Sequence, residues 1–177
     1  VCGKLPETAK FQDLLLHTIK SIAFFSKKLR ASGSITTEID FYITNSLFMT
    51  ITNANFDDDA IIVVIKKGLE IRDTLWSLAK EKGLEIENTF STYLTSTNEL
   101  VTKEQMISFA EKVGVLRTEN EDIRSLRELV IYGLKGLSAY VEHAFNLGKQ
   151  NTEIFKFIEK ALVEVDNPAN GADELVA

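Results

Sequence analysis

The stretch FQDLLLHTIKSIAFFSKKL, residues 11–29, carries the pattern that decides the fold. Its apolar residues recur at steps of three and four, which places them on one face of an α-helix. They are Leu14, Leu15, Ile19, Ile22, Ala23 and Leu29. Lys27, Lys28 and Arg30 suit the negative end of a helix, and Gly33 supplies a stop. We therefore expect an amphipathic helix.

Two more helices are predicted before the middle of the chain. Hydroxyl residues within 34–37 are candidate N-caps for a helix over about 38–50. The aspartates at 57–59 suit the positive end of a longer helix, which Gly83 ends.

A polar segment separates the two halves of the chain. Residues 87–99 are rich in Thr, Ser and Asn, so we expect an irregular connection with one short helical piece around 90–94. After it, Thr102 and Gln105 form a capping-box pattern that opens a helix ending at Gly114.

The second half ends with two further predicted helices. Apolar residues keep helical spacing over 119–147, up to Gly148. Another helix is expected over about 152–165, ended by Pro168. No stretch alternates apolar and polar residues for long enough to predict a strand. The sequence therefore predicts an all-α fold.

The two halves are related by a constant offset of 115 residues. This shift aligns Gly33 with Gly148, and Thr37-Glu38-Ile39 with Thr152-Glu153-Ile154. Other pairs continue the register: Leu14 with Leu129, Lys20 with Lys135, Ile43 with Ile158, and Leu47 with Leu162. We infer two similar three-helix bundles that arose by internal duplication. The first covers 1–86, the connection 87–101, and the second, truncated at its C-terminal end, 102–177.

Composition excludes two classes of partner. With 177 residues, 45% hydrophobic and 26% charged, the chain resembles an ordered globular protein. Its net charge is -6 and the signs are interspersed, so no basic stripe is available for nucleic acid. The strongest apolar run, 60–65, is far shorter than the roughly 20 residues that span a membrane, so no membrane partner is expected.

The two ends of the chain and its cysteine content indicate its cellular compartment and whether it is a fragment. No secretory signal is visible, and a single cysteine cannot form an internal disulfide, which fits the reducing cytoplasm. The chain starts without Met, and an acidic turn followed by apolar residues at 173–177 predicts the start of another helix. We expect that both ends are cut and that the chain is a fragment of a longer protein.

Cys2 is the most informative candidate site residue. A lone cysteine is by default a small buried hydrophobe. Cys2, however, precedes Gly3 and a helix entrance, where free amides and the helix dipole favour a thiolate.

The other candidates are interpreted as structural. His17 and His143 lack a glutamate three residues before them, so we expect helix-surface or subunit-contact histidines rather than di-iron ligands. The aspartates at 57–59 lack the spacing of a calcium loop and are interpreted as helix charges. Gly133 and Gly136, inside a helix, indicate the close approach of another backbone or of a cofactor, and we favour close helix packing. No catalytic motif is found, and no catalytic residue is predicted.

Several segments together resemble the hybrid-cluster (prismane) protein family, which includes hydroxylamine reductases. They are Val1-Cys2-Gly3-Lys4-x-Pro6-Glu7-Thr8-Ala9 with Gln12-Asp13-Leu14-Leu15, then Thr52-Asn53-Ala54-Asn55-Phe56-Asp57, then Tyr132-Gly133-Leu134-Lys135-Gly136 with Tyr140, Glu142, His143, Ala144, Leu147 and Gly148. These segments follow the order expected in the family and span nearly the whole chain.

The resemblance implies an iron-sulfur oxidoreductase. Its activities would be the reduction of hydroxylamine to ammonia, the reduction of nitric oxide, or both. It also implies two three-helix bundles in this domain. Two metal centres are implied in the intact protein. One is an iron-sulfur cluster, 4Fe-4S or 2Fe-2S, on four N-terminal cysteines, of which Cys2 would be the last ligand. The other is a hybrid iron-sulfur-oxygen cluster held by later domains.

This chain departs from the family pattern. The other three N-terminal cysteines and the later domains are missing, so we expect no cluster and no turnover from this chain alone. The implied partners are the remaining domains of the parent protein and an electron-donor protein. Exposed apolar faces predict a homodimer or swapped helices for the isolated fragment.

Two other interpretations remain. The chain could be a metal-free helical interaction module in which Cys2 is incidental. It also resembles the nickel carbon-monoxide dehydrogenase family, but Lys4, Pro6 and the segment 132–136 fit the hybrid-cluster family better.

Overall fold

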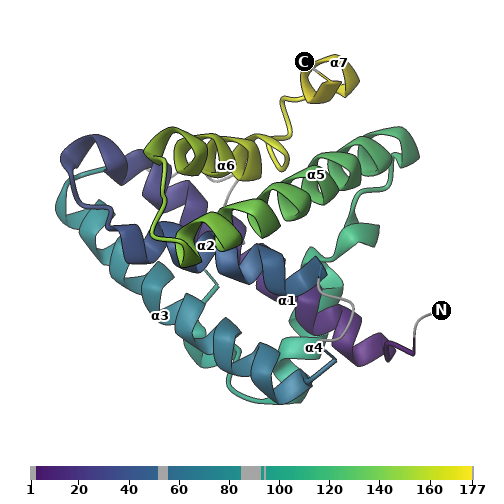
Figure 1. Ribbon diagram of the computed structural model, residues 1–177. Helices are drawn as coiled ribbons and strands as arrows, with labels where there is room; N and C mark the ends of the chain where they lie inside the picture. The colour runs from purple at the N-terminus through teal and green to yellow at the C-terminus, as the bar shows by residue number, and fades with distance from the viewer. Residues whose placement is uncertain (1–2, 52–55, 85–92, 94, 177) are drawn as a thin grey trace.

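The computed structural model describes residues 3–51, 56–84, 93 and 95–176 (Figure 1). Within these residues the chain forms helices and no strands, which confirms the all-α prediction. The α-helices are α1 (Pro6–Leu29), α2 (Thr37–Ile51), α3 (Asp58–Glu81), α4 (Lys103–Val113), α5 (Glu121–Asn146), α6 (Thr152–Glu164) and α7 (Ala172–Val176). Short 3-10 helices are η1 (Arg30–Ser32), η3 (Thr97–Glu99) and η4 (Val115–Arg117). No described helix is long and apolar enough to cross a membrane.

Helix ends follow the local sequence signals. Thr102 accepts from the backbone N–H of Gln105, whose side chain accepts from the backbone N–H of Thr102, so the predicted capping box is confirmed. The predicted stop at Gly83 is confirmed, with φ +67°. Helix α1 begins at Pro6, earlier than the periodicity predicts, because proline suits the first turn of a helix. The predicted helix start near residue 173 is confirmed by α7.

Helix α1 forms the centre of the core. It packs against α2, α3, α4 and α6. Its apolar residues Leu14, Leu15, Ile19 and Ile22 are fully buried. The apolar residues of 11–29 are therefore buried on a helix, as their spacing predicts, but this helix is covered by other helices on several sides.

Helix α5 lies across α2 and makes smaller contacts with α6 and α7 (Figure 1). The rings of Phe41 on α2 and Phe145 on α5 stack with centroids 4.0 Å apart. Ile131 and Leu134 of α5 are buried in the core. One face of α5 therefore packs against the rest of the chain.

The repeated unit occurs locally in both halves. Gly33 and Gly148 adopt left-handed φ values of +69° and +70°, and the next helices begin at Thr37 and Thr152. Whether this reflects duplication, and whether the halves are separate bundles, stays a prediction, since α1 packs against helices of both halves. The predicted helical piece around 90–94 lies outside the described residues except for Tyr93.

Candidate functional site

The entrance to α1 holds the predicted site residue. Cys2 itself lies outside the described residues, so its role as a ligand stays a prediction. The next residue, Gly3, has φ +85°, a turn conformation that suits glycine. Lys4 Nζ donates to Gln12 Oε1 at 2.6 Å and ties this turn to the first turns of α1. The entrance thus places a cation beside the N-terminus of a long helix.

The two histidines occupy different environments. His17 is buried, with its ring centroid 5.2 Å from that of Tyr93 and 5.6 Å from that of Phe109. The expected surface position is therefore wrong for His17, because α1 is covered on several sides. His143 is exposed and faces the Phe48 ring edge-on at 6.0 Å. In the described part of the chain, no group of three or more His, Cys, Asp or Glu could hold a metal ion.

The aspartates at 57–59 serve the start of α3. Asp57 Oδ1 accepts from the Ala60 backbone N–H at 3.0 Å and caps the helix. Asp59 pairs with Lys103 of α4 at 2.7 Å. Their predicted role as charges at the N-terminus of a helix is confirmed.

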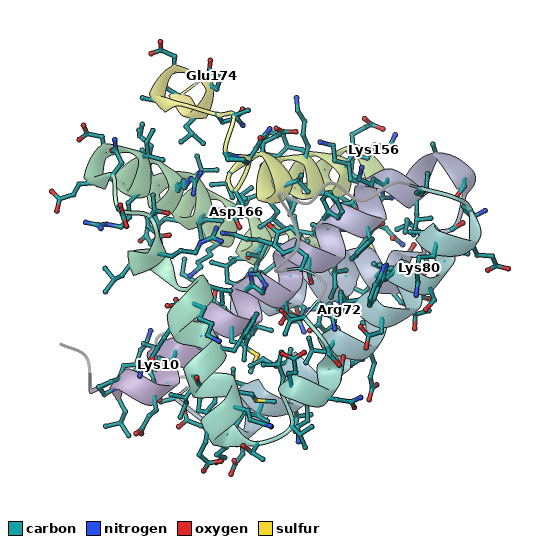
Figure 2. The ribbon with its side chains drawn as sticks, turned by 180° about the vertical axis from the view of Figure 1, so that it is seen from behind. Lys10, Arg72, Lys80, Lys156, Asp166 and Glu174 are labelled. Carbon is teal, nitrogen blue, oxygen red and sulfur yellow. The ribbon has the colours of Figure 1, made fainter. Side chains whose placement is uncertain are left out.

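A carboxylate that follows α6 joins three parts of the chain. Asp166 Oδ1 accepts from Lys20 Nζ of α1 at 2.9 Å, and Oδ2 accepts from Tyr93 Oη at 3.0 Å. In Figure 2, Asp166 lies near the middle of the molecule. Burial acts to raise the pKa of Asp166, but the charges of Lys20 and Arg117 and the hydrogen bonds from Lys20 and Tyr93 together outweigh it, so the pKa falls below its ordinary value. Burial and the same carboxylate hold the pKa of Tyr93 well above its ordinary value.

Arg72 of α3 anchors Tyr93 from the other side. The Arg72 side chain is almost fully buried. It donates from Nη1 to the Tyr93 carbonyl and from Nη2 to Thr97 Oγ1, both at 3.0 Å. Tyr93 is therefore held at its backbone as well as at its hydroxyl.

A small polar cavity lies beside this group, between α1, η4 and α5. Its volume is about 30 Å³, and its lining includes Asp13, Lys20, Arg127, Glu128 and Asp166. That volume holds one or two water molecules at most, so the cavity is too small for a cofactor. Burial, followed by the nearby Glu128, raises the pKa of Asp13. The cavity is a packed charge network rather than a substrate pocket.

A second ionic group ties α1 and α2 to α6. The Arg30 guanidinium pairs with Asp40 of α2 and with Glu159 of α6, and its Nε lies 2.8 Å from Glu159 Oε2. Glu159 is 2% exposed and also accepts from Ser26. Burial raises the pKa of Asp40 despite the nearby Arg30. The sequence shows Arg30 only as a basic residue near a helix end, so this cluster could not be predicted.

The two mid-helix glycines of α5 do not pack closely against any described element. Close helix packing was expected at Gly133 and Gly136, yet a Cβ added at either position would meet no atom of the described residues within 4 Å. The close approach occurs at Gly68 of α3 instead, where an added Cβ would lie 2.2 Å from Tyr42 Oη. Sequence spacing identifies a glycine in a helix, but not the element that faces it.

Comparison with known proteins identifies relatives over the whole chain. The family model described as "Prismane/CO dehydrogenase family" matches residues 1–176. A protein of Bacteroides fragilis called hydroxylamine reductase is 47% identical over 176 residues, which cover 99% of this chain and 31% of the relative. Its namesake from Bacteroides thetaiotaomicron is 48% identical with the same coverage. That of Desulfitobacterium hafniense is 43% identical over 178 residues, covering 100% of this chain and 32% of the relative. The chain spans about a third of the length of the curated relatives that it matches.

Proposed function

Because this chain belongs to the prismane/CO dehydrogenase family, we propose that it is the helical domain of an iron-sulfur oxidoreductase that reduces hydroxylamine. The observation that carries the proposal is the identity of 43–48% over the whole chain to proteins named hydroxylamine reductase. That name also favours this activity over that of a nickel carbon-monoxide dehydrogenase. Reduction of the N–O bond consumes two electrons and two protons and releases ammonia and water. An electron-donor protein supplies the electrons.

The residues present do not suffice for a cluster on their own. The chain contains one cysteine, whereas an iron-sulfur cluster needs about four protein ligands. In the proposed full-length protein, Cys2 is the last of four N-terminal cluster ligands and the remaining domains supply the hybrid cluster. Gly3 and the tie between Lys4 and Gln12 support this assignment, since they form a turn at a helix N-terminus, where a thiolate is stabilised.

The described residues then act as a scaffold. The ionic groups around Asp166 and Arg30 connect α1 and α2 to α6 and to the residues that follow it. The 177-residue chain by itself is proposed to be inactive. A single cysteine cannot form an internal disulfide, which favours the cytoplasm as its location.

The test compares Cys2→Ser with the unchanged residue in the full-length protein encoded by the reading frame that contains this chain. We expect the unchanged protein to hold iron and acid-labile sulfide and to form ammonia from hydroxylamine with a reduced dye as donor. Cys2→Ser should lose iron and more than tenfold of the activity. Lys156→Ser, on the exposed face of α6, is the matched control and should change neither.

A metal-free interaction module is the alternative, and the same preparation separates the two. An unchanged protein without iron or sulfide, or a Cys2→Ser variant with full iron and activity, contradicts the proposed role of this chain.

A further inference from the structure

Helix α5 presents two opposite apolar faces, of which only one is used within the chain. Ile131, Leu134 and Val141 point inward and are buried. On the other side, six residues form a stripe within about 60° of one direction around the helix axis. This outer face of α5 consists of Leu129, Tyr132, Gly133, Gly136, Tyr140 and Leu147.

The side chains of the outer face are in water. Leu129, Tyr132, Tyr140 and Leu147 are 66–79% exposed. At about 1.5 Å per residue, the stripe is about 27 Å long. No Asp, Glu, Lys or Arg between residues 129 and 147 lies within it. If α5 packed only against α2, the opposite side of the helix would face solvent and would be expected to carry charged residues. The uncharged, apolar stripe is instead typical of an interface.

The two glycines of the outer face also indicate an interface. Gly133 and Gly136 lower helix propensity, and the described structure places nothing near enough to need them small. A glycine pair one turn apart lets another backbone approach closely.

An apolar groove continues the outer face toward α6. Its volume is about 270 Å³, and it is lined mainly by Leu137, Tyr140, Val141 and Ala144 of α5 and by Ile154 of α6, with Lys149, Gln150 and Asn151 between the two helices at one end. Such a hollow accepts apolar side chains from a facing element. The stripe and the groove together are suited to binding an apolar surface.

We propose that the outer face of α5 is the docking surface for the part of the same polypeptide that follows residue 177 in the full-length protein. This inference rests on the proposed function, since it requires that further chain. The matched relatives are about three times as long as this chain. Helix α7, the last described element, packs against α5, so a continuing chain starts beside this helix (Figure 1).

A second copy of the chain suits this surface less well. A stripe 27 Å long and about 10 Å wide covers about 270 Å², whereas a stable complex of separate chains buries about 800 Å² per partner. A segment of the same polypeptide needs less area, because the covalent link raises its effective concentration.

The test is hydroxyl-radical footprinting of tyrosines by mass spectrometry, on the full-length protein and on the 177-residue chain. Tyr132 and Tyr140 should react at least fivefold more slowly in the full-length protein, where they approach the rate of the buried Tyr42. Tyr42 is the internal control, and its rate should change less than twofold. The full-length data alone also decide, because Tyr132 and Tyr140 are compared with Tyr42 in the same sample.

Two results overturn the inference. One is that both tyrosines react in the full-length protein at rates within twofold of the 177-residue chain. The other is that they become protected in the full-length protein only as its concentration rises, which assigns the face to a second copy. Hydroxylamine reduction and iron content are measured on the same sample. An active protein with reactive tyrosines refutes the docking surface alone, and an iron-free, inactive protein with protected tyrosines refutes the proposed function alone.

Discussion

Substitution of Gly68 by alanine tests the packing of α3 against α1 and α2. A Cβ at Gly68 would lie 2.2 Å from Tyr42 Oη and 2.7 Å from Thr18 Cγ2. Neither neighbour moves freely. Tyr42 is buried and donates to the Val64 carbonyl at 2.8 Å, and Thr18 Oγ1 donates to the Leu14 carbonyl at 2.9 Å. The added methyl group must therefore displace a packed and hydrogen-bonded ring.

The magnitude follows from three contributions. Overpacking costs about 1–3 kcal/mol, and loss of the Tyr42 hydrogen bond costs about 1 kcal/mol. The better helix propensity of alanine returns about 1 kcal/mol. The net change should be a loss of about 2 kcal/mol in the free energy of unfolding. With a urea m-value of about 2 kcal/mol/M, the unfolding midpoint should fall by about 1 M.

The assay is urea unfolding followed by circular dichroism. Gly136→Ala in the same 177-residue chain is the matched control, because there its Cβ meets no described atom within 4 Å and only the propensity gain of up to about 1 kcal/mol should appear. Tyr42→Phe removes the nearest atom, so Gly68→Ala should cost less in that background, with a coupling above about 0.5 kcal/mol. A Gly68→Ala chain as stable as the parent, or the absence of coupling to Tyr42→Phe, would refute this account of the contact.

Three further predictions concern charge and capping. Arg30→Met leaves the buried carboxylates of Asp40 and Glu159 without their cationic partner and should lower the free energy of unfolding by about 3–5 kcal/mol, measured by urea unfolding. A loss below about 1 kcal/mol contradicts a stabilising role for this cluster. Asp166→Asn should lower the melting temperature near pH 6, because a lowered pKa stabilises the fold fully above the ordinary aspartate pKa of 3.8. This loss should shrink as the pH falls from 3.8 through the lower folded pKa, and a loss that stays constant over that range contradicts the direction of the shift. Thr102→Ala removes the capping box and should cost about 1 kcal/mol, whereas Thr102→Ser should cost little; equal stability of the two variants contradicts the cap.

Much of the fold could be predicted because its signals are local. The capping box at Thr102 and the stops at Gly83 and Gly148 depend on backbone groups within a few residues. Helical periodicity likewise depends on near neighbours, so the all-α class was predictable. The candidate site was less accessible, since Cys2 is linked to a cluster by family resemblance and lies outside the described residues.

What the sequence by itself determined is the local conformation: where each helix begins and ends, and that α1 carries an apolar stripe. Only the tertiary structure decided which residues meet. Arg30 pairs with Glu159, 129 residues away, and Lys20 with Asp166, 146 residues away. The same holds for the glycines, since Gly68 faces a buried ring while Gly136 faces open space. Local signals cannot distinguish these cases, because a side chain's neighbours across the core come from distant segments that only the folded chain brings together.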